Sequence, residues 1–138
     1  MAILEIANLE LCLTQYLRTF HFLAKRGFDL IAVIANRESR CRQDVIGAVG
    51  EIGLMQINPL VWRDEPYNWN RLHEGTGLDW DAVHTVEGNI LMGAWILNNA
   101  IITMGGDLRR GLALYNGYSE AGLKYADEVI QKYKELKQ

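Results

Sequence analysis

The sequence has few of the residues that build metal centres or redox pairs. Cys12 and Cys41 are its only cysteines, and neither stands close to another Cys or to a His. The three histidines are scattered, without the spacing that metal ligands show. We therefore expect no metal and no cofactor, and two buried thiols in preference to a disulfide.

A concentrated basic charge is also missing. The formal net charge is -3 and the sequence pI is about 5.6. Proteins that bind nucleic acid usually gather Lys and Arg on one face. We expect no nucleic-acid partner, and a neutral or mixed-charge polymer fits the composition better.

The chain lacks a long uninterrupted hydrophobic run. Glu5 and Glu10 interrupt the apolar first 25 residues, and no Lys or Arg precedes Arg18. This pattern predicts neither an export signal nor a membrane span. Apolar residues in the same stretch recur at helical spacing, which predicts a core-facing helix, with a helix lying on a membrane surface as the alternative.

No segment shows the alternation of a strand, and the predicted fold is all-α. A chain of 138 residues, 49% of them hydrophobic, can bury one core, so we expect a single domain over residues 1–138. Gly105-Gly106 marks a helix boundary, while Asp107 and Ser119 suit helix starts. The expected helices cover about 3–25, 28–39, 87–104, 107–116 and 119–136, with an irregular middle at about 41–85.

The irregular middle is long, and long loops in compact domains are often functional. It carries Trp62, Trp69 and Trp80 among acidic and amide side chains. That mixture suits stacking on sugar rings and hydrogen bonding to sugar hydroxyls. A secondary hydrophobic core with polar turns is the alternative.

One motif combines a carboxyl with a glycine-punctuated loop. Glu38-Ser39 is followed by Gly50-Glu51-Ile52-Gly53-Leu54-Met55-Gln56 and then by Pro59. The residues before Glu38 are apolar and helix-compatible, so its carboxyl would lie at the end of a buried helix and keep its proton. The arrangement suggests an acid that acts on a sugar chain.

These residues resemble the soluble lytic transglycosylases of the lysozyme-like superfamily, whose signature pairs Glu-Ser with Gly-x-x-Gly-Leu-Met-Gln. Two later blocks match in order: Asn89-Ile90 with Gly93, and Ala113-Leu114-Tyr115-Asn116-Gly117, with Tyr125 on the closing helix. The resemblance covers nearly the whole chain. A long paired signature is more specific than a short motif.

The resemblance implies a mainly helical fold and cleavage of peptidoglycan between N-acetylmuramic acid and N-acetylglucosamine. The muramyl 6-hydroxyl, in place of water, would close a 1,6-anhydro ring. Glu38 would be the sole catalytic acid and base. The substrate-binding residues would be Ser39, Met55, Gln56, Tyr115 and Asn116.

The implied place of action is the bacterial cell wall, in the periplasm or outside the cell. Phage origin, a leader that has been removed, or delivery by a partner secretion apparatus would each account for the lack of an evident export signal.

Departures from the family pattern keep two alternatives open. Gly47 stands where many relatives have Ser, and Glu51 where Ala is common. Glu51, or less strongly Asp44 or Asp64, could position a water and make the protein a lysozyme-type hydrolase. A cell-wall-binding or assembly module without catalysis is the second alternative. The joint presence of Glu38, Met55, Gln56 and Tyr115 argues against it.

Overall fold

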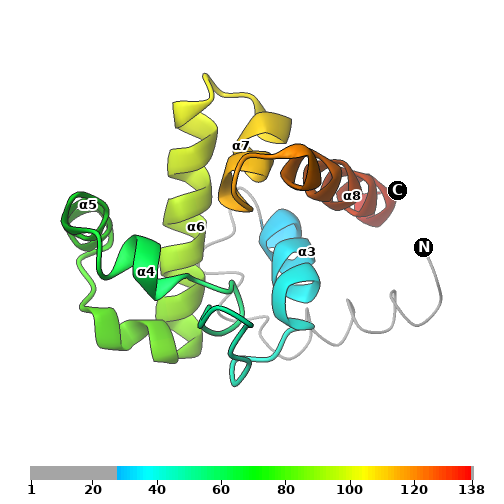
Figure 1. Ribbon diagram of the computed structural model, residues 1–138. Coiled ribbons are helices and arrows are strands. Elements are labelled where there is room, and N and C mark those ends of the chain that lie inside the picture. Colours follow the sequence, from blue (N-terminus) through cyan, green and yellow to red (C-terminus); the bar gives the residue numbers. More distant parts are fainter. Residues whose placement is uncertain (1–27, 138) are drawn as a thin grey trace.

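A computed structural model describes residues 28–137, and Figure 1 shows how their helices are arranged. The element order is α3, α4, α5, a 3-10 helix η1, α6, α7 and α8. No strand forms in this part of the chain, which agrees with the predicted all-α class. The helix predicted over about 3–25 lies outside the described residues.

Helix α3 (Phe28–Ser39) carries the motif glutamate in its last turn. Ile31, Ala32, Val33, Ile34 and Ala35 are all buried, so this helix runs through the core. The helix ends where the backbone enters the left-handed region, at φ values of 53° and 60° for the two residues after Ser39. Such turns satisfy the last carbonyls of a helix.

Helix α6 (Val86–Thr103) is the central element in Figure 1. Thr85 caps its start by accepting a hydrogen bond from the Gly88 amide. The antiparallel pair α7 (Leu108–Tyr115) and α8 (Glu120–Lys137) follows, with α7 against α6 and α8 against both α7 and α3. These bounds confirm the four helices predicted after residue 27.

The two predicted caps are also confirmed. The side chain of Asp107 accepts a hydrogen bond of 2.9 Å from the Arg110 amide, and the Ser119 hydroxyl one of 3.0 Å from the Gly122 amide. A short polar side chain at the first position of a helix offers an acceptor to amides that have no partner within the helix.

The prediction of an irregular middle is wrong for about half of that segment. It contains α4 (Pro59–Trp62), α5 (Pro66–Thr76) and η1 (Trp80–His84). Both prolines stand at the start of a helix, where the missing amide hydrogen costs nothing, and Asn58 and Glu65 cap the two starts. Proline here begins helices instead of breaking them.

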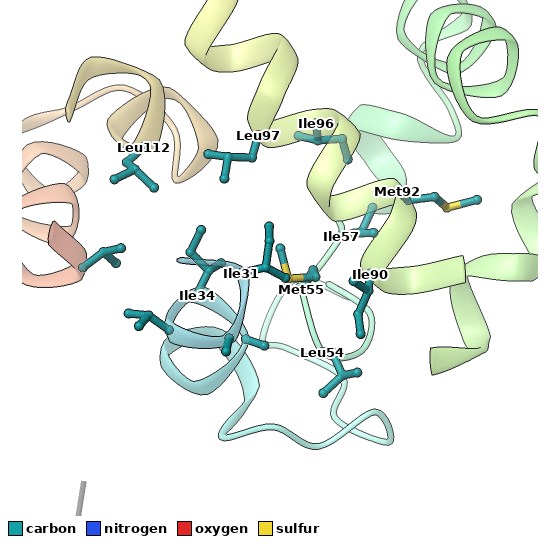
Figure 2. Close-up of a cluster of buried hydrophobic side chains, with 14 of the residues drawn as sticks. Ile31, Ile34, Leu54, Met55, Ile57, Ile90, Met92, Ile96, Leu97 and Leu112 are labelled. Atoms are coloured by element: carbon teal, nitrogen blue, oxygen red, sulfur yellow. The ribbon is translucent and has the colours of Figure 1, made fainter. Parts of the chain in front are cut away.

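The core joins α3, α6 and the loop between α3 and α4 (residues 40–58), which we call the motif loop. Figure 2 shows Met55 of this loop beside Ile31 of α3. Met55 also contacts α6 at Gly93, where an added Cβ would lie 2.5 Å from the Met55 Cγ. The motif loop is thus anchored in the core by its own apolar side chains.

The expectation of a free thiol at position 41 is wrong. Cys41 is buried and disulfide-bonded. Spacing along the chain does not show which residues meet in space, so the sequence did not reveal this bond. The prediction for Cys12 falls outside the described residues.

Candidate active site

A cavity of about 440 Å³ opens between the motif loop and helices α3 to α7. Four of the six predicted site residues line it: Glu38, Gln56, Tyr115 and Asn116. Its volume lies within the range of about 300–1,000 Å³ that is usual for ligand clefts. Segments distant in sequence therefore bring these four side chains to one place.

The Glu38 carboxyl is mostly withdrawn from solvent. Burial is the main cause that raises its pKa above the ordinary value of 4.5, and the nearby carboxylate of Glu51 acts in the same direction. Tyr125 and Arg37 oppose this shift, the first by hydrogen bonding and the second by its charge. The net effect is a carboxyl that keeps its proton to a higher pH than an exposed one, as the sequence predicted.

Arg37 lowers the pKa of Glu38 by its charge, although its guanidinium also pairs with a carboxylate on α8. Its Nη2 lies 3.0 Å from Glu128 Oε2 on α8. Its guanidinium carbon lies 5.5 Å from the centre of the Tyr125 ring. Adjacent positions on a helix point in different directions, so the arginine faces the α8 surface while Glu38 faces the cavity.

Tyr125 on α8 was matched to the family pattern from the sequence but was given no role at the site. It is 4% exposed, and its phenol oxygen has no partner of full hydrogen-bond geometry within residues 28–137. The phenol nevertheless lies close enough to lower the pKa of Glu38, and burial beside Glu38 raises its own pKa. The Tyr125 phenol can thus donate a hydrogen bond to the Glu38 carboxyl, and this bond strengthens when Glu38 becomes an anion.

The motif loop is held by a buried amide, that of Asn89 on α6. Its Oδ1 accepts from the Met55 amide at 2.8 Å, and its Nδ2 donates to the carbonyls of Ile52 and Val83 at 3.0 and 2.8 Å. Gly53 is required at this contact, because a Cβ there would lie 2.4 Å from the Asn89 Nδ2. The only sequence signal for this role was the place of Asn89 in the later family block.

Ser39 and Met55 do not reach the cavity. The Ser39 hydroxyl is buried within 2.9 Å of the carbonyl oxygens of Ala35 and Leu54. Met55 is 0% exposed. In this structure the Ser39 side chain braces the motif loop and the Met55 side chain packs in the core. Their contact with the substrate stays a prediction.

The remaining predicted residues combine cavity surface with bracing. Tyr115 donates its hydroxyl proton to the Met55 carbonyl at 2.7 Å, and burial and the charge of Glu38 raise its pKa. Gln56 donates through Nε2 to the Gly53 carbonyl at 2.9 Å and the Val45 carbonyl at 3.3 Å. Asn116 follows α7 as its C-terminal cap and is exposed at the cavity wall.

A model of the family described as Transglycosylase SLT domain matches residues 27–137, the whole described structure. The chain belongs to this family. Its members are transglycosylases of peptidoglycan, the polymer of the bacterial cell wall, on a lysozyme-like helical fold. No curated protein matches the sequence at a significant level.

Gly47 and Glu51 lie side by side in the motif loop, and Glu51 lines the cavity. Gly47 leaves room for the end of the Glu51 side chain, since a Cβ there would lie 2.8 Å from Glu51 Oε1. The same oxygen accepts a hydrogen bond of 2.9 Å from the Val49 amide. The Glu51 carboxylate, fixed by the Val49 amide, thus occupies space that a side chain at position 47 would fill.

The other two acids proposed for water positioning are placed less well. Asp44 is exposed and lies 3.8 Å from Arg42, while Asp64 is paired with Arg63 at 2.7 Å. Neither lines the cavity, so Glu51 is the second carboxylate of this site.

Other features of the SLT domain bear on metals and membranes. Between residues 28 and 137, no three His, Cys, Asp or Glu side chains gather in a way that could hold a metal ion. None of the described helices is both long and apolar enough to cross a membrane.

Proposed function

We propose that this SLT domain cleaves the β-1,4 bond between N-acetylmuramic acid and N-acetylglucosamine in peptidoglycan, forming 1,6-anhydromuramyl products. One observation carries the proposal: Glu38 is a partly buried carboxyl with a raised pKa that opens into a cavity of substrate size. A general acid needs a proton at the working pH and access to the leaving oxygen. Glu38 combines both properties.

The reaction needs one carboxyl used twice. Glu38 first gives its proton to the glycosidic oxygen, and the bond from that oxygen to the muramyl C1 breaks. The substrate's own N-acetyl oxygen supports the positive charge that develops at C1, as in substrate-assisted glycosidases. The Glu38 carboxylate then takes the proton of the muramyl 6-hydroxyl while the oxygen of that hydroxyl bonds to C1. This step closes the anhydro ring and restores the protonated Glu38.

The surroundings of Glu38 suit both halves of this cycle. Burial favours the protonated form before cleavage. After proton transfer, the phenol of Tyr125 can stabilise the carboxylate by a charge-assisted hydrogen bond. Gln56 and Asn116 offer amide groups along the cavity wall for the sugar.

A lysozyme-type hydrolysis is the second candidate, and the position of Glu51 favours it. This carboxylate lines the same cavity and is near enough to Glu38 to affect its pKa. Inverting glycosidases use a second carboxylate as the base that activates water. In that case the muramyl product would carry a reducing end.

Product chemistry decides between the two. Isolated peptidoglycan is incubated with wild type, Glu38→Gln and the control Glu74→Gln, an exposed change on α5 outside the cavity. The released fragments are then weighed by mass spectrometry. We expect anhydro products, lighter than hydrolysed ones by one water, from wild type and Glu74→Gln only.

Other results have distinct meanings. Hydrated products that disappear in Glu38→Gln and in an additional Glu51→Gln protein would establish the hydrolase. Binding of the glycan without products from any protein would leave a cell-wall-binding or assembly module. Action in the periplasm or outside the cell, and delivery by a secretion or phage apparatus, stay predictions.

A further inference from the structure

The cavity has a second polar wall that the proposed chemistry does not use. We call it the arginine side, and it consists of residues from α5 and α6: Asn68, Arg71, Asn99 and Thr103. In the view of Figure 1, α5 and α3 lie on opposite sides of α6. This wall is therefore built by elements other than those that carry Glu38.

Arg71 is held in a fixed orientation. Its guanidinium carbon lies 5.1 Å from the centre of the Tyr67 ring and 5.7 Å from that of Trp95. One of its nitrogens, Nη2, donates to Asn99 Oδ1. A guanidinium has more donors than this single bond uses, and a planar group between rings loses little freedom on binding a ligand.

The charge of Arg71 is not neutralised by the described residues. No carboxylate of residues 28–137 lies within 4.0 Å of its nitrogens, whereas Arg37, Arg63 and Arg109 each have such a partner. The group is half-buried and lines the cavity. A partly desolvated cation without a counter-charge favours the binding of an anion, and the guanidinium fork matches a carboxylate.

The proposed substrate carries such a group at a suitable place. Each muramyl residue bears a 3-O-lactyl substituent, which is either a free carboxylate or the attachment point of a stem peptide with carboxylates of its own. N-acetylglucosamine has no counterpart. We propose that Arg71, with the neighbouring amides of Asn68 and Asn99, binds a carboxylate on the muramyl substituent and so aligns the muramyl residue with Glu38.

This inference rests on the proposed substrate, but it can be tested without cleavage. Binding is measured by calorimetry in the Glu38→Gln background with three glycan oligomers of equal length. One has a free lactyl carboxylate, one carries stem peptides, and one has its lactyl carboxyl converted to a neutral methyl amide. The variants are Arg71→Gln, Arg71→Lys and the control Arg63→Gln, an exposed arginine outside the cavity lining.

We expect Arg71→Gln to raise the Kd about tenfold or more for at least one charged glycan, the gain usual for a hydrogen bond to a charged group. Arg71→Lys keeps the charge without the fork and will show part of that loss. Neither change will alter the Kd of the methyl amide glycan, and Arg63→Gln will alter the Kd of no glycan. The charged glycan that responds identifies the source, lactyl or stem peptide.

Three results would overturn the assignment. Equal weakening for the charged and neutral glycans would mean that Arg71 only supports the fold. An unchanged Kd for all three would exclude a contact, and so would a failure of the Glu38→Gln protein to bind any of them. If wild type cleaves no peptidoglycan but binding still depends on Arg71, the proposed function is wrong and the carboxylate site at Arg71 is retained.

Discussion

The cavity has two walls that are supported by different parts of the molecule. The acid side consists of Glu38, Glu51, Gln56, Tyr115 and Asn116, and Figure 2 shows the buried cluster that anchors the motif loop. The arginine side takes Asn68 and Arg71 from α5, of which only Leu72 is buried, and two further residues from α6. Residues anchored in a core tolerate little substitution, whereas residues on a helix with a single buried side chain tolerate more. We infer that the acid side carries the chemistry and the arginine side the selectivity.

The largest effect is expected at the support of the acid side. Asn89→Ala removes three hydrogen bonds to the motif loop and its surroundings and leaves the Met55 amide without its partner. We expect a loss of about 2–4 kcal/mol in the free energy of unfolding. Urea denaturation measures it, with Asn98→Ala on the exposed face of α6 as control.

That control is expected to change the free energy of unfolding by less than about 0.5 kcal/mol. An Asn89→Ala protein as stable as Asn98→Ala would show that the motif loop does not depend on this amide.

The arginine side has its own point of weakness. An alanine Cβ at position 75 would lie 2.1 Å from the Trp95 Nε1, so Gly75→Ala must displace the ring beside Arg71. We expect a stability loss of about 1–3 kcal/mol, offset in part by the better helix propensity of alanine. Binding of charged glycans will weaken while that of the neutral amide stays the same.

Thermal unfolding and the binding assay together test Gly75→Ala, with Glu74→Ala as the control in the same turn. Equal weakening for charged and neutral glycans would show that the two walls are not independent.

The raised pKa of Glu38 predicts a smaller effect on stability that depends on pH. The folded protein holds this proton to a higher pH than the unfolded chain, so stability falls as pH rises through the folded pKa. Glu38→Gln cannot ionise and escapes that loss. Its melting temperature will exceed that of wild type at neutral pH, and the two will converge below 4.5, the ordinary value for glutamate.

Melting curves across pH test this, with Glu74→Gln as a matched exposed exchange. A constant difference between Glu38→Gln and wild type at every pH would contradict a shifted pKa at Glu38.

The smallest effect is expected from the neighbouring carboxylate. The Glu51 carboxylate raises the pKa of Glu38 by a smaller amount than burial does, so Glu51→Gln will lower that pKa. If Glu38 acts as the acid, activity will decline at a lower pH on the alkaline side, with less than about a tenfold change at the optimum. The pH profile of kcat/KM measures the shift. A larger loss, with hydrated products disappearing, would instead indicate a base for water.

Helices α7 and α8 could be predicted because Asp107 and Ser119 mark their starts. Helix α5 could not, because it is polar apart from Leu72 and begins with a proline that also suits a turn. Its stability comes from contacts with α6, which local sequence does not record.

The sequence by itself determined the helical class, the family signature and the identity of Glu38 as the candidate acid, because these depend on residue types at fixed spacing. Only the tertiary structure decided which side chains face the cavity. Ser39 and Met55 stand next to site residues in the chain but turn into the core, while Tyr125 and Arg71 reach the cavity region from distant helices. The direction of each side chain, and which side chains come together, depend on how the helices pack, and this packing involves the whole chain.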